Sequence, residues 1–247
     1  MSYPSVFYLA NAGIYLTDRK TGILVDGLFE RYDGFDTLPV SIETAIMEKQ
    51  PPFEQLTTLL FTHTHVDHYS AGRVSAYLER YPETECILPA PADSGCHTVS
   101  IHSGSEHYVY STHTGFSKAV VEQIYSKHLM DKGKIVPHTA LFLNYAGQCF
   151  FFSGDSDPVY LNRYIPQEIL SACCGKTTMA FVNPFFFPLA PGRRFLENLN
   201  PKQIFVYHMP LQVPDPLRYH EILDRGLAKY SGKAPVRTMN RFMCRLQ

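Results

Sequence analysis

Short apolar runs separated by polar turns predict a chain built from many β-strands with helices between them. The first three runs predict a β-meander, at residues 6–9, 13–17 and 23–26. Later runs predict strands at residues 59–61, 86–89, 119–125, 139–145, 148–152, 180–184 and 201–208. Apolar positions at helical spacing predict helices at residues 42–48, 71–81, 159–172, 192–198 and 216–230. Several of the predicted strands end in residues that can bind a metal ion.

The most informative stretch follows the fourth apolar run. The turn between this strand and the next helix contains four potential metal ligands, His63, His65, Asp67 and His68. Imidazole and carboxylate groups suit zinc, and also iron or manganese. His63 and His65 project the same way in an extended turn, and the other two can face a second ion. The alternative is a histidine-rich surface loop, but such loops seldom place this pattern directly after a buried strand.

Three further residues stand at the ends of predicted strands. Asp26 ends the third strand, where it either caps the following turn or is a buried carboxylate that needs partners. Asp155 follows the strand at 148–152, where a helix N-cap is the alternative role. His208 ends the last predicted strand, a position that would be unremarkable for a single histidine.

The pattern His63-x-His65-x-Asp67-His68 resembles the signature of the metallo-β-lactamase superfamily, and a weaker resemblance extends over most of the chain. This resemblance implies one domain over residues 1–247, of the α/β class, folded as a four-layer αβ/βα sandwich. It also implies a site for one or two metal ions at one edge of the sheets. The signature is informative about the superfamily and much less so about the substrate.

The resemblance also implies a ligand set for two divalent ions. The first ion would be bound by His63, His65, His128 and Asp155. The second ion would be bound by Asp67, His68, Asp155 and His208. Asp155 would bridge the two ions, because a carboxylate offers two oxygens and offsets the repulsion between cations. Asp26 would support the metal-binding loop through hydrogen bonds.

Two histidines compete for the third position at the first ion. His128 stands at the end of a predicted strand, where ligands of this superfamily emerge, and His138 stands at the start of the next strand. Neither lies in the Gly-His-Thr pattern that is commonest in the superfamily. We prefer His128, and expect His138 to lie behind the ligands in the same pocket.

The ligand set predicts a hydrolase that acts on a small molecule through ester, lactone or phosphodiester cleavage. Two ions, zinc in the first instance with manganese or iron as alternatives, would lower the pKa of a shared water and supply a hydroxide. Asp67 would orient that water or take its proton. The compact chain and the late histidine most resemble the lactonase and phosphodiesterase branch. The alternatives are a mononuclear iron oxygenase of the same fold and a metal-binding protein without turnover.

Composition narrows the class of partner and the compartment. The chain has 247 residues and a formal net charge of −1, so it lacks the basic excess that holds a nucleic-acid backbone. No apolar stretch reaches the roughly 18 residues that span a membrane, and no signal peptide is visible. Six cysteines without C-x-x-C spacing are typical of reduced thiols, so we expect a cytoplasmic protein with a small-molecule substrate. The oligomeric state is not predicted.

Three other segments carry open expectations. Residues 29–58 are irregular and can border the active site. Residues 97–113 contain four histidines without a known metal-binding spacing, and a loop or hairpin is predicted. Residues 185–188 are very apolar and either pack beneath a loop or form a wall of the substrate pocket. Arg193 and Arg194 either contact an anion or begin a solvated helix.

Overall fold

The computed structural model describes residues 3–89, 100–102, 109–129, 136–210, 215, 218–239 and 244–246. Side chains are described for all of these except residues 100–102, 109 and 110. From the sequence we expect a turn or a short helix to begin at residues 91–95, and these residues lie outside the described part of the chain. So do Cys96, His97 and His107.

Five strands from the first 87 residues and one strand from the C-terminal end form a mixed sheet with the strand order β14-β1-β2-β3-β4-β5. Its strands are β1 (Ser5–Ala10), β2 (Gly13–Thr17), β3 (Gly22–Val25), β4 (Leu56–Leu60), β5 (Glu85–Ile87) and β14 (Cys244–Arg245). The strands from β14 to β3 are antiparallel, whereas β3, β4 and β5 are parallel. The ends of β3 and β4 therefore lie at the same edge.

The second sheet has the order β13-β12-β11-β10-β9-β8-β7-β6. Its strands are β6 (Ser100–His102), β7 (Val109–His113), β8 (Val120–Tyr125), β9 (Thr139–Tyr145), β10 (Gln148–Phe152), β11 (Thr177–Val182), β12 (Gln203–Val206) and β13 (Val236–Thr238). Strands β10 to β13 run parallel, and β8 points the same way because β9 is antiparallel to both β8 and β10. The ends of β8, β10, β11 and β12 and the start of β9 share one edge.

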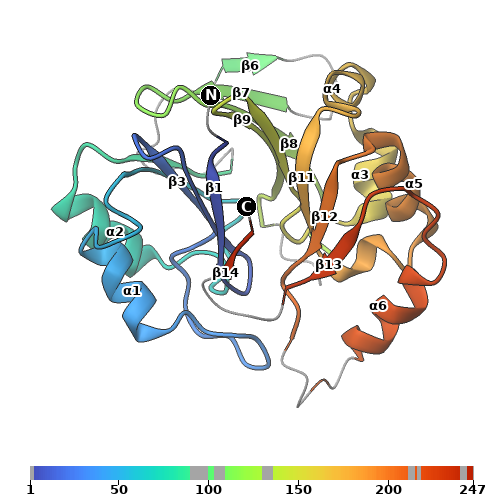
Figure 1. The fold of residues 1–247 in the computed structure, drawn as a ribbon, viewed down its shortest axis with the longest axis horizontal. Helices are drawn as coiled ribbons and strands as arrows, with labels where there is room; N and C mark the ends of the chain where they lie inside the picture. The colour runs from blue at the N-terminus through green and yellow to red at the C-terminus, as the bar shows by residue number, and fades with distance from the viewer. Residues whose placement is uncertain are drawn as a thin grey trace.

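The helices cover the outer faces of both sheets, as Figure 1 shows. The first sheet is covered by α1 (Val40–Met47) and α2 (Ala71–Arg80). The second is covered by α3 (Pro158–Tyr164), α4 (Gln167–Cys173), α5 (Ala190–Leu199) and α6 (Tyr219–Leu227), together with the 3-10 turn η1 (Pro184–Phe186). The predicted four-layer αβ/βα sandwich is confirmed.

Successive side chains of a strand point to opposite faces of the sheet, and this alternation explains how each sheet packs between two layers. In β9, Leu141 and Leu143 point into the core between the two sheets, while Phe142 between them packs under the helices of the second sheet. Both faces of this strand are buried from Thr139 to Leu143, and Asn144 near its end is exposed. Strands buried on two sides read as continuous apolar runs, which is why they were visible in the sequence.

Most predicted elements are present, with instructive differences. The helix predicted at 159–172 is two helices, α3 and α4, because Pro166 lacks an amide hydrogen and cannot continue α3. The histidine-rich segment forms the hairpin β6–β7 in its described part. Strands β13 and β14 are not predicted, since two or three residues carry no periodic signal.

Two further observations concern disulfides and membrane spans among the described residues. The five cysteines that the structure describes form no disulfide with one another. Among the described helices, none has the length and apolar character needed to cross a bilayer.

Candidate metal centre

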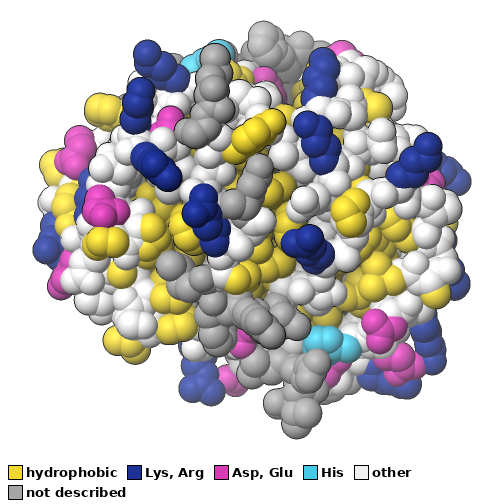
Figure 2. All heavy atoms as spheres, in the orientation of Figure 1, with side chains coloured by type: hydrophobic (Ala, Val, Ile, Leu, Met, Phe, Trp, Pro, Cys, Tyr) yellow, Lys and Arg dark blue, Asp and Glu magenta, His cyan; other side chains and the backbone are white. Residues whose placement is uncertain are grey.

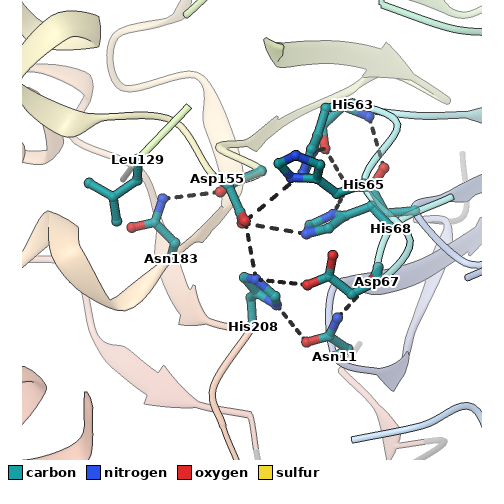
Figure 3. A network of polar contacts seen from close by, with 12 residues as sticks. Asn11, His63, His65, Asp67, His68, Leu129, Asp155, Asn183 and His208 are labelled. Carbon is teal, nitrogen blue, oxygen red and sulfur yellow. Dashed lines mark hydrogen bonds and ion pairs between the residues drawn. The ribbon is translucent and has the colours of Figure 1, made fainter. Parts of the chain in front are cut away.

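The predicted ligands meet where the two sheets share an edge. His63, His65, Asp67 and His68 follow β4 in the first sheet, and the remaining ligands follow strands of the second sheet, His128 after β8, Asp155 after β10 and His208 after β12. Figure 3 shows Asp155 facing His63, His68 and His208 across the junction. Residues more than a hundred positions apart in sequence thus converge on one carboxylate.

Asp26 holds the loop that follows β4, which we call the metal loop (residues 62–69). Its fully buried carboxylate accepts hydrogen bonds from the Thr62 amide at 2.8 Å and the Thr62 hydroxyl at 2.7 Å. It also accepts a hydrogen bond from His68 Nδ1 at 3.0 Å. The role of Asp26 is therefore to fix the metal loop, rather than only to cap the turn after β3.

Hydrogen bonding fixes the ring tautomer of four histidines. The Nδ1 atoms of His68, His128 and His208 each face an oxygen that can only accept: Asp26 Oδ2, the Leu129 carbonyl and Asn11 Oδ1. His63 Nδ1 faces the Thr62 hydroxyl, whose hydrogen is already donated to Asp26. All four rings therefore donate from Nδ1, and in the neutral form each presents an Nε2 lone pair to the centre.

These four Nε2 atoms surround the Asp155 carboxylate. Their distances to its oxygens are 3.9 Å for His63, 3.4 Å for His68, 3.3 Å for His128 and 3.2 Å for His208. Ligand atoms about 2.0–2.2 Å from a tetrahedral zinc ion lie about 3.3 Å from one another. The spacing therefore fits a cation between each imidazole and the carboxylate.

The side chains form three overlapping groups whose ligand atoms lie within 4.8 Å of one another. The groups are His63, His65 and His128; His63, His68 and Asp155; and Asp67, His68 and His208. Within the described part of the chain, buried His63 Nε2, His68 Nε2 and Asp155 Oδ1 have no hydrogen-bond partner. Buried polar atoms need partners, and a bound metal would supply one to each of these three. The residues present therefore fit the metal ions that the fold implies.

Asn11 supports the group formed by Asp67, His68 and His208. It lies in the turn between β1 and β2, and its side-chain oxygen accepts from His208 Nδ1 at 2.5 Å. Its side-chain amide donates to the Asp67 carbonyl at 2.8 Å, and its own carbonyl accepts from the His208 amide. His208 Nε2 lies 3.6 Å from Asp67 Oδ2. One buried asparagine thus positions two predicted ligands.

The structure places the two competing histidines differently. His128 Nε2 lies 3.0 Å from His65 Nδ1 and within reach of the Asp155 carboxylate. His138 is fully buried, and its Nε2 accepts a hydrogen bond from the Asp155 amide at 2.9 Å. A nitrogen engaged in this way holds the Asp155 backbone and has no lone pair left for an ion. The geometry favours His128 as ligand and His138 as support.

The electrostatics of the centre favour a cation. Burial lowers the pKa of His63 well below its ordinary value, and the neighbouring His68 and His138 add to the effect. Burial also lowers the pKa of His68, but the carboxylates of Asp155 and Asp26 outweigh it and raise that pKa well above its usual range. Burial raises the pKa of Asp155, but His208 and His68 outweigh it and hold it well below its ordinary value. Asp155 is therefore an anion that attracts positive charge.

Comparison with solved structures identifies the architecture. The chain is similar to the metallo-β-lactamase fold protein YhfI from Bacillus subtilis, with 11% identity, a TM-score of 0.60 and 98% of each chain covered. It is also similar to Igni18, a metallo hydrolase from Ignicoccus hospitalis, with 13% identity and a TM-score of 0.60 over 99% of this chain and 98% of the other. The chain has the metallo-β-lactamase fold.

A third protein with this fold has a different described chemistry. CmlA from Streptomyces venezuelae, described as a diiron β-hydroxylase, matches with 16% identity and a TM-score of 0.59. The match covers all of this chain but only 55% of CmlA. No family model and no curated protein matches the sequence.

Sequence reasoning missed the residues that orient the ligands. Asn11 and Thr62 gave no signal of their own, because an asparagine in a turn and a threonine after a strand have ordinary explanations. The open expectation for the two arginines has a structural answer. Arg193 donates to the carbonyls of Phe187 and Pro188, and Arg194 is exposed.

Proposed function

We propose that the chain is a metal-dependent hydrolase that cleaves an ester, lactone or phosphodiester bond in a small molecule. The observation that carries the proposal is the convergence of four Nε2 atoms with fixed tautomers on the Asp155 carboxylate. In this arrangement the buried atoms His63 Nε2, His68 Nε2 and Asp155 Oδ1 have no hydrogen-bond partner among the described residues, and a bound cation would satisfy all three together.

In this proposal the seven side chains bind two divalent ions, zinc in the first instance. His63, His65 and His128 bind one ion, and Asp67, His68 and His208 bind the other. Asp155 contributes to both, because its oxygens face histidines of both groups. Asp26, Thr62, Asn11 and His138 hold these ligands in place, as hydrogen-bonded neighbours of metal ligands commonly do.

When bound, such ions would supply a hydroxide nucleophile at neutral pH and polarise a carbonyl or phosphoryl oxygen of the substrate. Asp67 is the residue placed to accept the proton released from the attacking water, through Oδ2. This carboxylate is nearly buried, and its backbone carbonyl is fixed by Asn11. A positioned acceptor of this kind needs no serine or cysteine nucleophile.

Oxygenase chemistry is the second candidate function. The similarity to CmlA, which is described as a diiron enzyme, supports it at the level of the fold. Imidazole and carboxylate ligands also suit iron. In that case the protein as isolated would carry iron and consume oxygen with a reductant, without hydrolysing esters.

The hydrolase proposal is tested on protein that has been treated with a chelator and then reloaded with zinc or manganese. Hydrolysis of methyl phenylacetate, γ-butyrolactone and bis(p-nitrophenyl) phosphate is followed in a pH-stat. We expect turnover of at least one class only after reloading, and a loss of about a hundredfold or more in kcat for Asp67→Asn. Asp157→Asn is the matched control, because Asp157 caps α3 and asparagine caps equally well. If neither the zinc-loaded nor the manganese-loaded protein hydrolyses any of the three substrates, the proposal is wrong.

A further inference from the structure

Aromatic side chains from three segments meet beside His208. The ring of Phe35 stacks on the His208 imidazole, with centroids 4.6 Å apart and an interplanar angle of 18°. Tyr219 meets Phe35 edge-on at 6.3 Å and meets Phe185 edge-on at 5.1 Å. Phe35, Tyr219 and Phe185 are here called the aromatic wall.

The aromatic wall lies at the margin of the core, and Tyr219 packs against the core cluster under the helices of the second sheet. All three of its side chains are partly exposed, whereas Phe186 and Phe187, next to Phe185, are fully buried among the helices. The wall comes from the loop after β3, from η1 and from the first residue of α6. Core packing accounts for Phe186, Phe187 and the inner side of Tyr219. It does not account for the partly exposed rings of Phe35 and Phe185, which meet Tyr219 beside a predicted ligand.

Two further exposed apolar side chains lie in the segments that carry the wall and the predicted ligands. Tyr32 lies 5.8 Å from Phe35, between ring centroids, and is 50% exposed. Val66, in the metal loop itself, is 48% exposed. Burial is the main cause that raises the pKa of Tyr219, and the charge of Asp155 is the next, which is consistent with a phenol near the ligands.

Among the residues that the structure describes, three basic side chains from segments next to the wall or the ligands have other partners. Arg31 pairs with Asp33, and Arg218 pairs with Glu221. Lys127, the neighbour of His128, is exposed and lies over the Tyr160 ring. On the face drawn in Figure 2, Lys and Arg side chains are spread apart rather than gathered in one patch. An anionic substrate would be expected to meet a free Arg or Lys beside the ions.

We propose that the aromatic wall binds a flat apolar group of a neutral ester or lactone whose carbonyl lies at the metal centre. The inference rests on the proposed function and names its substrate class. Rings that meet edge-to-face leave ring faces on which a planar group stacks. The wall begins at His208, so a group lying on it extends directly from the reacting carbon.

The test compares two esters that share a leaving group, methyl phenylacetate and methyl acetate. Hydrolysis consumes water and releases methanol, the carboxylate and a proton, which the pH-stat titrates. For the zinc-loaded wild type we expect kcat/KM to favour the phenyl ester. Tyr219→Ala should lower this preference about tenfold, the factor that about 1.4 kcal/mol of stacking and burial provides. Tyr219→Phe keeps the ring and should retain the preference within about twofold.

Phe116→Ala is the matched control, since this exposed ring lies in the turn before β8, at the opposite edge of the sheet. It should leave the preference unchanged. Equal losses on both esters for Tyr219→Ala would overturn the proposal, because the wall would then act on the centre as a whole. Faster hydrolysis of bis(p-nitrophenyl) phosphate than of either ester would overturn it as well.

A binding measurement separates this inference from the hydrolase proposal. Calorimetry with phenylacetate and acetate needs no turnover. We expect zinc-loaded wild type to bind phenylacetate about tenfold more tightly than acetate, and Tyr219→Ala to lose that difference. If no ester is hydrolysed but this difference in binding is present, the wall binds a flat apolar group and the hydrolase proposal is wrong. Equal affinities for phenylacetate and acetate would show that the wall does not bind the phenyl group.

Discussion

Asn11 shows how one residue joins the two ends of the chain at the metal centre. It lies in the first turn of the protein and contacts His208, 197 positions later. Its backbone φ of 49° is one that asparagine tolerates better than most residues. A turn asparagine is explained by the turn alone, so the sequence could not reveal this contact.

Removing the Asn11 side chain should weaken metal binding. Asn11→Gly keeps the positive φ accessible but frees His208 Nδ1 and the Asp67 carbonyl. We expect the affinity of the more weakly bound zinc to fall about 10- to 100-fold, the usual effect of losing a hydrogen bond behind a ligand. Competition with a chromophoric chelator measures it. Asn200→Gly, another asparagine with positive φ that lies at the end of α5, is the control. Equal affinities in both variants would contradict the role of Asn11.

His138 should make the stability of the metal-free protein depend on pH. Burial lowers its pKa well below the ordinary value of 6.5, so the folded state resists a proton that the unfolded state accepts. The stability contributed by neutral His138 is complete above pH 6.5 and is lost as the pH falls, by at most about 1.4 kcal/mol per pH unit. His138→Gln can still accept from the Asp155 amide but does not titrate.

We therefore expect the free energy of unfolding in urea to fall less between pH 7.5 and 5.0 in His138→Gln than in wild type, both treated with a chelator. The pKa of His63 is lowered like that of His138, and the pKa of His68 is raised, so their effects on the pH dependence of stability have opposite signs. Both residues are present in wild type and in His138→Gln, so the comparison isolates His138. Parallel pH profiles for the two proteins would show that His138 does not titrate in this way.

At the scale of elements, the sequence predicted most of the strands but not how they pair. Buried strands such as β9 and β10 appear as apolar runs, and the turn between them appears as Ala146-Gly147. The metal loop was predicted because four ligands follow one strand. The positions of β8, β10 and β12 relative to β4 depend on pairings across distant sequence, which no local pattern encodes.

Gly154, which precedes Asp155, lies in close contact with the metal loop and with His138. Its φ is +50°, and an added Cβ would lie 2.7 Å from Thr62 Oγ1 and 2.8 Å from His138 Nε2. Gly154→Ala should cost at least about 2 kcal/mol of unfolding free energy, from backbone strain and from this overlap. It should also weaken zinc binding, because Asp155 follows directly. Urea unfolding and zinc titration measure the two effects.

Gly147→Ala separates the two causes, because Gly147 also has a positive φ, +75°, but meets nothing within 4 Å. It should cost only about 1 kcal/mol, from the backbone, and leave zinc binding intact. If Gly154→Ala and Gly147→Ala lose the same free energy of unfolding, the close contact with the metal loop is not the reason that residue 154 must be glycine.

At the scale of the molecule, the centre lies across the junction of the sheets. Four proposed ligands follow β4 in one sheet, and the other three follow strands of the second. The core between the sheets joins the same halves through side chains such as Leu60 and Phe152. Metal ions would add a second connection between halves that the core already holds together, so removing them should loosen the molecule without unfolding it.

Zinc should accordingly stabilise the protein by mass action. Adding zinc to chelator-treated protein at a hundredfold excess over its dissociation constant should contribute about 2.7 kcal/mol and raise the melting temperature. Magnesium, which prefers oxygen ligands in octahedral geometry, is the control cation and should have little effect. Calorimetric melts over a zinc series test this. A melting temperature that does not change with zinc concentration would contradict the claim that bound metal connects the two halves of the molecule.

The central claim is that seven side chains hold two divalent ions, and the metal content of the purified protein tests it most directly. Elemental analysis compares wild type with His128→Ala and His138→Ala, and wild type should contain about two ions per chain. The metal content should fall for His128→Ala and stay near two ions for His138→Ala, because of these two histidines only His128 directs a lone pair at the ions. A folded wild type without metal, or a loss confined to His138→Ala, would contradict the account.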